Sequence, residues 1–321
     1  MKDQITISFP GLGIEDFSVS KVAFSIGSLE IRWYGIIITL GMVAAVLYAT
    51  YRSKQKGIKF DDMLDMALFT ILFGVIGARL YYVIFYGNVH SFYDVIAIWE
   101  GGLAIYGGII GGVLAIYGVC RYKKMNFFGM ADMIGPGVML AQAMGRWGNF
   151  FNGEAYGSIV PEGSPLYFLR MGLYPHPHDY HEIAGMIYVH PTFLYESIWN
   201  IFGFVLINVF YKKKKFDGEV ALWYFAWYGF GRMFIEGLRT DSLMLGPFRI
   251  SQLIGLLCFG AGTALMIWGR IHYFRKEKAT AGTSAQSEAI IEAKIKEMIE
   301  KNEIKVENIQ ENEEIKNGED H

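Results

Sequence analysis

Residues 131–157 read ADMIGPGVMLAQAMGRWGNFFNGEAYG, and this stretch passes directly from an apolar run into a polar cluster. The apolar part has the character of a membrane-spanning helix, which needs about 20 residues. The polar part places Arg146, Asn149, Asn152 and Glu154 at the end of that run. An arginine in the middle of a bilayer costs at least about 3 kcal/mol. An arginine at such a position is therefore expected to have a structural or functional role.

The composition of the whole chain favours an integral membrane protein. Of the 321 residues, 53% are hydrophobic and only 19% are charged, and the mean hydropathy is +0.27. Soluble domains of this length carry more charge. Cys120 and Cys258 both lie within apolar runs, so the sequence indicates no disulfide framework. Residues 1–28 lack the features of a cleaved signal peptide, so we expect the first span to act as its own signal.

Seven apolar stretches have the length of a transmembrane helix and predict an all-α integral membrane protein with seven spans. They lie at 31–51, 63–86, 99–119, 127–149, 191–211, 219–238 and 251–270. The chain is therefore expected to divide into a seven-span catalytic domain at 1–278, which includes a long loop at 150–189, and a charged tail at 279–321. We expect the tail to be partly helical or disordered.

The charge of the connecting segments predicts the orientation of these spans. Basic residues cluster in the links at 52–59, 121–124 and 212–215, whereas the links at 87–98 and 150–189 are almost free of them. Links rich in lysine and arginine remain on the cytoplasmic side of a membrane. We therefore expect the N-terminus outside, the C-terminus in the cytoplasm, and the long loop on the outer face.

The sixth predicted span carries a second polar cluster. Tyr228, Arg232, Glu236 and Arg239 are separated by four, four and three positions, which places them on one face of a helix. Arg232 and Glu236 alone would form an ordinary structural ion pair. Together with Arg146, however, the arginines suit an anion, because guanidinium groups match phosphate oxygens with paired hydrogen bonds.

Two further features allow both a functional and a structural interpretation. Arg79 lies toward the outer end of the second predicted span, where it either contacts the anion or extends to the lipid headgroups. The third span contains two overlapping GxxxG motifs between residues 107 and 112, which let another helix approach closely. Such packing would place Tyr106 beside a tight helix contact.

The sequence indicates no metal site and no cofactor. His176, His178 and His181 cluster in the long loop, but a proline interrupts them and no cysteine accompanies them. We find no phosphate-binding or dinucleotide-binding glycine motif and no nucleophile elbow. His190, which opens the motif HPTFLYES at 190–197, is more typical of an interfacial anchor than of a catalytic base.

Six motifs are distributed along the chain. They are VAFSIGSLEIRWYG (22–35), GAR (77–79), EGGLAIYGGIIGG (100–112), GRWGNFFNGEAYG (145–157), HPTFLYES (190–197) and YGFGRMFIEGLRTD (228–241). Together they resemble the bacterial phosphatidylglycerol–prolipoprotein diacylglyceryl transferases over roughly residues 20–273. The glycine-flanked run at 145–157 is the most specific of the six. The tail from KEKATAGT onward matches nothing in the core of that family.

The resemblance implies a multi-pass enzyme of the bacterial cytoplasmic membrane that carries out the first step of lipoprotein maturation. Its partners would be phosphatidylglycerol and prolipoprotein signal peptides with a lipobox cysteine. The diacylglyceryl group would move to the cysteine thiol, with formation of a thioether and release of glycerol phosphate. Neither a cofactor nor a nucleic acid is implied.

The resemblance also assigns roles to matching positions. Arg146 and Asn149 correspond to an essential pair in the family's signature, and Tyr34 corresponds to a tyrosine needed for activity. The polar stripe of the sixth span matches a functional stripe of the family. The residues expected to act in catalysis are Tyr34, Tyr106, Arg146, Arg232 and Arg239. The residues expected to bind phosphatidylglycerol are Arg79, Arg146, Asn149, Asn152, Glu154, Tyr228, Arg232 and Glu236.

One position departs from part of the family. Some members have a histidine, proposed as the catalytic base, where this chain has Tyr106. A phenol has an ordinary pKa of about 10 and a thiol one of about 8.5, so the substrate thiol loses its proton more readily than the tyrosine. We therefore expect Tyr106 to donate a hydrogen bond rather than to act as the base.

Two other classes of protein fit less well. An anion or lipid transporter also places arginines inside a helical bundle, but internal repeats and broken helices are typical of that class and are not evident here. A CDP-alcohol phosphatidyltransferase would need an aspartate-rich metal motif that the sequence lacks.

Overall fold

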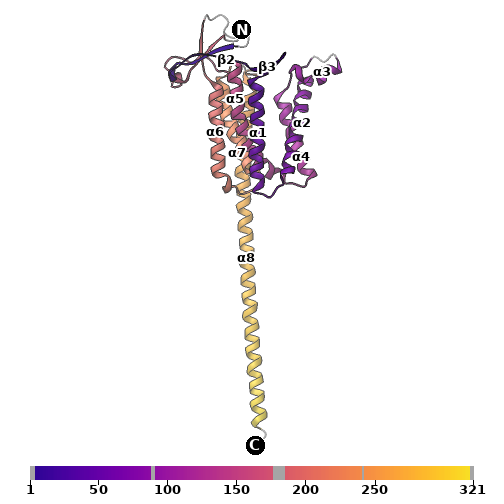
Figure 1. The fold of residues 1–321 in the computed structure, drawn as a ribbon. Helices are drawn as coiled ribbons and strands as arrows, with labels where there is room; N and C mark the ends of the chain where they lie inside the picture. The colour runs from indigo at the N-terminus through magenta and orange to yellow at the C-terminus, as the bar shows by residue number, and fades with distance from the viewer. Residues whose placement is uncertain (1–3, 88–90, 176–184, 241, 319–321) are drawn as a thin grey trace. The chain divides into compact units, whose positions relative to one another are not determined.

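The computed structural model describes residues 4–87, 91–175, 185–240 and 242–318, and it is mostly helical (Figure 1). The chain divides into two compact units, Met1–Met266 and Ile267–His321. The long helices are α1 (Trp33–Lys54), α2 (Phe60–Phe85), α4 (Ile105–Tyr122), α5 (Phe127–Asn152), α6 (Thr192–Phe210), α7 (Glu219–Leu238) and α8 (Ile250–Gly318). Short helical segments are α3 (Phe92–Ile96), η1 (Pro10–Leu12), η2 (Ile98–Glu100), η3 (Tyr167–Leu169) and η5 (Tyr211–Lys213).

Five of these helical segments are long and apolar enough to cross a membrane. They are Trp33–Lys54, Phe60–Phe85, Ile105–Tyr122, Thr192–Lys213 and Ile250–Lys278. Helices therefore occupy the predicted spans, and the protein has the character of an integral membrane protein. The helices α5 and α7 carry buried charged side chains, among them Asp132 and Glu236. The number of seven spans and their orientation stay predictions.

The third predicted span begins later in the structure than in the prediction. We expected it at 99–119, but α4 begins at Ile105. Gly101 and Gly102, which precede it, have φ angles of +92° and +71°. These positive angles suit glycine and are incompatible with a right-handed helix, so the helix cannot begin before them.

The expectation of an all-α protein is wrong, because the structure also contains β-strands. Four antiparallel strands form a sheet in the order β2-β1-β5-β6. These strands are β1 (Gln4–Phe9), β2 (Ile14–Ser20), β5 (Met171–Tyr174) and β6 (Ile187–Val189). Two hairpins accompany the sheet, one formed by β3 (Val22–Ile26) and β4 (Leu29–Arg32) and one by β7 (Met244–Leu245) and β8 (Phe248–Arg249).

The four-stranded sheet joins the N-terminal segment to the long loop between α5 and α6. Ile5, Ile7 and Phe9 alternate with more polar residues along β1 and are buried. They pack in one cluster with Leu173 of β5 and Phe150 of α5. Alternation with a period of two is the signal of a half-buried strand, and β1 shows it in the sequence QITISF. Figure 1 shows these strands above one end of the helices, and we call this end of the bundle the sheet end.

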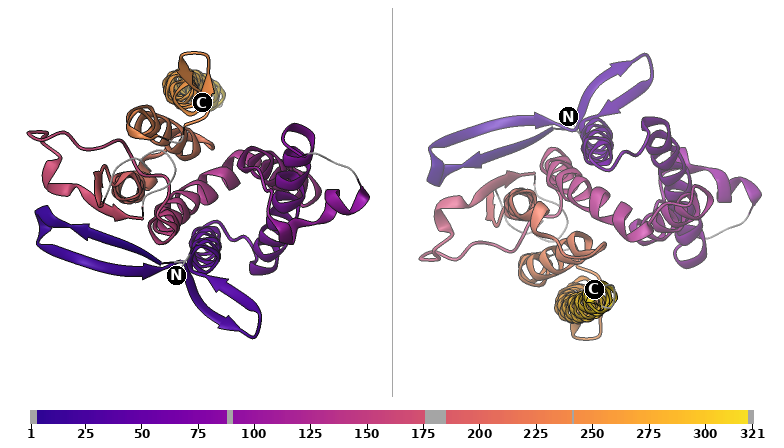
Figure 2. Two further views of the ribbon diagram at one scale, coloured as in Figure 1. Left: turned by 90° about the horizontal axis from the view of Figure 1, so that it is seen from above. Right: turned by 90° about the horizontal axis from the view of Figure 1, so that it is seen from below.

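The glycine motifs of α4 bring its backbone against that of α2, as the sequence predicts. A Cβ atom added at Gly107 would lie 2.2 Å from the carbonyl oxygen of Gly77, and one added at Gly111 would lie 2.2 Å from that of Phe73. Real Cβ atoms do not approach an oxygen so closely. The two helices lie side by side in Figures 1 and 2 because glycine leaves room for direct backbone contact.

A buried carboxylate fixes the start of α7 at the end of the bundle opposite the sheet. Asp132 of α5 is fully buried and accepts hydrogen bonds from Lys214 (2.7 Å) and from the backbone of Gly218 (2.9 Å) and Ala221 (3.0 Å). A negative charge at the N-terminus of a helix is stabilising. Lys214 also contacts Asp217 at 2.9 Å, and this hydrogen bond lowers the pKa of the Asp217 carboxyl.

Replacement of Gly111 by alanine is expected to destabilise the protein, whereas the same change at Gly118 of α4 is not. The methyl group at position 111 would overlap a backbone oxygen, and overpacking costs about 1–3 kcal/mol. At Gly118 a Cβ atom meets nothing within 4 Å, and alanine favours a helix over glycine by about 0.5–1 kcal/mol. Thermal unfolding in detergent measures both variants. Equal unfolding temperatures would contradict the close packing of α2 against α4.

Candidate active site

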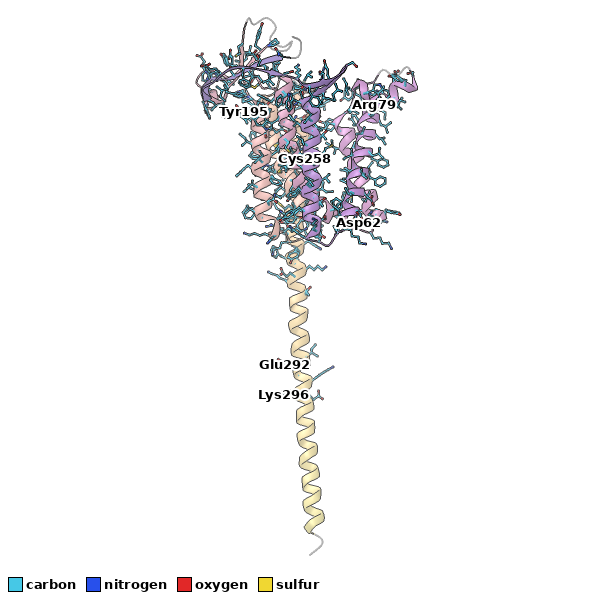
Figure 3. The ribbon with its side chains drawn as sticks, in the orientation of Figure 1. Asp62, Arg79, Tyr195, Cys258, Glu292 and Lys296 are labelled. Carbon is cyan, nitrogen blue, oxygen red and sulfur yellow. The ribbon has the colours of Figure 1, made fainter. Side chains whose placement is uncertain are left out.

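Three helices meet at the sheet end of the bundle and carry most of the predicted site residues. The helices α5 and α7 end there, and α6 begins there. Trp147 of α5 donates from Nε1 to the hydroxyl of Ser197 on α6 at 3.2 Å, and that hydroxyl donates to the carbonyl of Ala143 at 3.0 Å. Figure 3 labels Tyr195 of α6 at this end of the molecule. These bonds fix the start of α6 against the last turns of α5.

A glutamate of α6 bridges two of the predicted arginines. One carboxylate oxygen of Glu196 lies 2.6 Å from the guanidinium of Arg146, and the other lies 3.0 Å from that of Arg232. The Glu196 side chain is only 5% exposed. A buried charge is tolerated where it is paired and hydrogen-bonded, so this carboxylate and the two arginines stabilise one another.

Arg232 has a second acidic partner on its own helix. Its guanidinium lies 2.5 Å from the carboxylate of Glu236, one turn further along α7. Arg239 follows after the end of the helix and lies 3.9 Å from the same carboxylate. The carbonyl of Arg239 accepts a hydrogen bond from Arg249 at 2.8 Å. The spacing in the sequence therefore corresponds to a shared face, and Arg232 lies between two carboxylates.

The signature run at the end of α5 forms its own hydrogen-bond network. Arg146 donates to the side-chain oxygen of Asn149 at 3.3 Å. Asn149 and Asn152 both donate to Glu154, at 3.0 and 3.1 Å. The chain can turn back in this way because Gly153 ends the helix in the left-handed conformation, with φ of 62°. The four polar residues that the sequence singled out are thus connected through their side chains.

The predicted tyrosines lie on three different helices. The ring of Tyr34, on α1, packs against Gly148, where an added Cβ atom would lie 2.6 Å from a ring carbon. Gly148 lies between Arg146 and Asn149 in α5, so the glycine brings the tyrosine to this part of the helix. Tyr228 lies one turn before Arg232 on α7.

Arg79 and Tyr106 belong to the α2–α4 pair. Arg79 is buried and donates four hydrogen bonds to backbone carbonyls of the segment between the two helices. The acceptors are Asp94 (2.6 Å), Val95 (3.1 Å), Gly101 (2.5 Å) and Gly102 (3.0 Å). Tyr106 follows this segment in the first turn of α4, with its ring 6.3 Å from that of Tyr81. Arg79, labelled in Figure 3, thus orders the chain that leads to Tyr106.

The sequence did not predict a role for Glu196, although this residue belongs to the motif HPTFLYES. Glu196 is the only charged residue between 192 and 210, and a charge inside an apolar span marks a functional or pairing site. His190 itself is buried, and burial lowers the pKa of its imidazole. Its Nδ1 atom lies 3.2 Å from the hydroxyl of Tyr195.

The acidic groups of this cluster, which include Glu154 through Asn149, are unevenly divided among its arginines. The arginines Arg146, Arg232 and Arg239 face the two glutamates Glu196 and Glu236. Arg232 lies between two carboxylates, and its side chain is 12% exposed. Arg146 shares one carboxylate, and its side chain is 21% exposed. Arg146 therefore has one direct carboxylate partner and the more accessible N–H groups, which suits the binding of an anion.

Among the described residues, no group of three or more histidine, cysteine, aspartate or glutamate side chains could hold a metal ion. The loop residues His176, His178 and His181 lie outside the described part of the chain.

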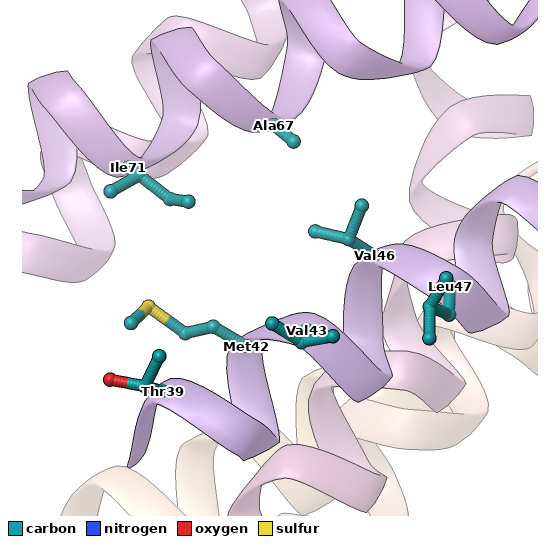
Figure 4. A pocket seen from close by; sticks show the side chains of 7 residues that line it. All are labelled: Thr39, Met42, Val43, Val46, Leu47, Ala67 and Ile71. Carbon is teal, nitrogen blue, oxygen red and sulfur yellow. The ribbon is translucent and has the colours of Figure 1, made fainter. Parts of the chain in front are cut away.

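An apolar pocket of about 260 Å³ lies between α1 and α2 (Figure 4). It is lined by Thr39, Met42, Val43, Val46, Leu47, Ala67 and Ile71. The hydroxyl of Thr39 donates to the carbonyl of Gly35 at 2.8 Å, so its hydrogen-bonding need is met within α1. The pocket therefore suits a hydrocarbon chain rather than a polar ligand.

Comparison with known proteins identifies relatives over most of the chain. The model of the prolipoprotein diacylglyceryl transferase family matches residues 21–268. A phosphatidylglycerol–prolipoprotein diacylglyceryl transferase of Clostridium perfringens is 45% identical over 260 residues, which are 78% of this chain and 94% of the relative. The enzyme of the same name from Clostridium novyi is 45% identical over 82% of this chain and 99% of the relative. That of Streptococcus pneumoniae is 44% identical over 78% and 94%.

Replacement of Glu196 by glutamine is expected to lower the free energy of unfolding by about 3–5 kcal/mol, because removing one partner of a buried ion pair leaves the other uncompensated. Glu154→Gln is the matched control, since Glu154 is exposed and accepts from amide groups. Thermal or denaturant unfolding in detergent compares the two variants. The double variant Glu196→Gln/Arg146→Gln should recover part of the loss, because Arg232 keeps Glu236 as a partner whereas Arg146 loses its carboxylate. Independent effects of the two substitutions would show that they do not form a coupled pair.

Proposed function

The chain belongs to the prolipoprotein diacylglyceryl transferase family, and we propose that it transfers the diacylglyceryl group of phosphatidylglycerol to the lipobox cysteine of prolipoproteins. The observation that supports the assignment of the site is the bridge from Glu196 to Arg146 and Arg232, which holds the Arg146 guanidinium inside the helical bundle. In this proposal the protein acts at the bacterial cytoplasmic membrane, in the first step of lipoprotein maturation.

We place the sheet end of the bundle at the outer face of the membrane. The links at the opposite end hold the clusters of lysine and arginine, which remain in the cytoplasm. In this orientation α5 and α7 also cross the bilayer, and the buried polar side chains face the interior of the bundle. The arginine cluster then lies near the outer leaflet, where phosphatidylglycerol can supply its headgroup from the side.

Arg146 is the residue that we assign to the phosphate. Phosphatidylglycerol carries one negative charge, and Arg146 has N–H groups that its contacts with Glu196 and Asn149 do not use. Arg232 lies between two carboxylates, so its role is to orient Glu196 and thereby Arg146. Asn149 fixes the other side of the Arg146 guanidinium. A planar guanidinium held from both sides presents its remaining N–H groups in a fixed direction.

The chemistry needs charge stabilisation more than covalent help. The cysteine sulfur attacks a saturated carbon of the glyceryl group, a carbon–sulfur bond forms, and the bond from that carbon to the phosphate oxygen breaks. Glycerol phosphate leaves with the bonding electron pair, and the thiol proton is released as the sulfur is alkylated. Cations held where the leaving oxygen gains charge lower the barrier, because they need no rearrangement during the reaction.

The apolar pocket between α1 and α2 supports a lipid substrate. Its lining offers hydrocarbon contacts, and α1 also carries Tyr34 at its sheet end. We assign Tyr106 a hydrogen bond to the phosphate or the sulfur. We assign Arg79 to the ordering of the segment from Asp94 to Gly102, because four of its hydrogen bonds go to carbonyls there.

Arg146→Lys is expected to lower the transfer rate about 10- to 100-fold, because a lysine keeps the charge but loses a charge-assisted hydrogen bond worth about 1.5–3 kcal/mol. The assay follows label from phosphatidylglycerol to a lipobox peptide in detergent. Arg121→Lys, at an exposed position of α4, is the matched control. If the Arg146 variant kept more than half of the activity, the phosphate contact would have to be assigned elsewhere.

Tyr106→Phe is expected to lower the transfer rate about 10- to 100-fold, as for the loss of one donor to a developing anion. The rate at subsaturating peptide should rise with pH until the bound thiol has lost its proton. Complete inactivity of a folded variant that still binds lipid would instead favour Tyr106 as the base.

Deletion of residues 280–321 is expected to leave membrane insertion and transfer unchanged, because the proposed site lies within 1–266 and the family match ends at residue 268. Carbonate extraction and the label-transfer assay test the two properties. A truncated protein that inserts normally but is inactive would contradict the assignment.

A further inference from the structure

The hairpin of β3 and β4 has one apolar face and one polar face. The strand register places Phe24 opposite Ile31 and Ile26 opposite Leu29. Side chains two residues apart in a strand point to the same side, so these four residues share one face. Ser25 pairs with Glu30 on the other face. The Glu30 carboxylate also lies 3.5 Å from the guanidinium of Arg32.

Three of the four residues of this apolar face are exposed, and Ile31 is half-buried. Phe24 is 51% exposed, Ile26 65% and Leu29 62%. The hairpin is a separate two-stranded sheet, and an isolated hairpin is at best marginally stable in water. A contiguous apolar face of this kind indicates a contact with a partner or a membrane.

The position of the hairpin identifies the bilayer as that contact. Strand β4 ends at Arg32, and α1, one of the five membrane-length helices, begins at the next residue. The backbone N–H of Trp33 donates to the carbonyl of Lys21 at 3.1 Å, which fastens the base of the hairpin to the start of the helix. Trp33 and Tyr34 are both more than one-third exposed here, and these residue types concentrate at membrane interfaces.

A second hairpin repeats the arrangement. Strands β7 and β8 immediately precede α8, another membrane-length helix. Leu245 and Phe248 face each other next to its turn, and both are exposed. Each hairpin thus places apolar side chains where the chain enters a membrane-length helix.

We propose that the β3–β4 hairpin is an interfacial anchor that lies with the face of Phe24, Ile26, Leu29 and Ile31 in the outer headgroup–acyl boundary of the bilayer. Its polar face, with Ser25 and Glu30, remains in water. Because β4 continues directly into α1, the anchor fixes the depth of Tyr34, two residues beyond the end of the strand. The inference rests on the proposed embedding of α1 in the membrane and not on the chemistry of transfer.

Adjacent positions on opposite faces of β3 provide the test. Nitroxide labels are attached to Ile26→Cys and Ser25→Cys in the full chain with Cys120→Ala and Cys258→Ala. The proteins are reconstituted in vesicles of phosphatidylglycerol and phosphatidylcholine. Collisions with molecular oxygen, which enters the bilayer, and with a nickel chelate, which remains in water, are measured by electron paramagnetic resonance.

The label at position 26 is expected to collide more with oxygen than with nickel, and the label at position 25 more with nickel than with oxygen. Leu29→Cys, on the neighbouring strand, should behave like position 26 and replaces it if that variant folds poorly. Nickel-accessible labels at 26 and 29 would overturn the proposal in favour of a hairpin free in water. Labels shielded from both reagents would overturn it in favour of a protein contact.

The same labelled proteins are assayed for transfer from phosphatidylglycerol to a lipobox peptide. An oxygen-accessible label at position 26 in a protein without activity would leave the anchor standing and count against the proposed function. A nickel-accessible label at position 26 in an active protein would count against the anchor and leave the proposed function standing.

Discussion

A carboxylate held between two guanidinium groups is the constraint on which the sheet end of this molecule depends. Glu196 belongs to α6, whereas Arg146 and Arg232 belong to α5 and α7, so one side chain connects three helices. An arginine at the centre of a membrane costs at least about 3 kcal/mol, and a buried charge that loses its partner is strongly destabilising. The three helices therefore cannot slide or rotate independently without exposing a charge.

Polar contacts with α5 and α6 fix the helix α7 at both ends and in between. At one end Asp132 of α5 caps its first turn, and at the other Glu196 of α6 binds Arg232. Between these points, the indole N–H groups of Trp199 and Trp227 each donate to the backbone carbonyl of the other residue at 3.0 Å. The two rings stack at 4.2 Å. The two indole groups and the Glu196–Arg232 pair thus have their partners on the neighbouring helix, as suits polar groups in a bilayer.

The sequence predicts those features of the fold and the site whose pattern lies within one short stretch of residues. Apolar runs and the spacing of Arg232 and Glu236 are local, and the helices and their ion pair follow from them. Strand β1 pairs with β5, more than 150 residues away, and short strands in a chain dominated by membrane-length helices were overlooked. The partners of Arg79 are backbone carbonyls, and no sequence motif predicts such partners. Glu196 was visible as a lone charge, but its partners lie on other helices.

For the function proposed above, the bridge from Glu196 to Arg146 and Arg232 explains how the site can both bind and release an anion. Without lipid, the Arg146 guanidinium is paired with the Glu196 carboxylate at 2.6 Å. When a phosphodiester binds, Arg146 is the group with N–H donors to spare, while Arg232 stays fixed between two carboxylates. The departing glycerol phosphate can gain a second charge as it leaves. Glu196 and Glu236 stay beside the arginines, so they repel a doubly charged product more strongly than the bound diester, and this difference favours release of the product.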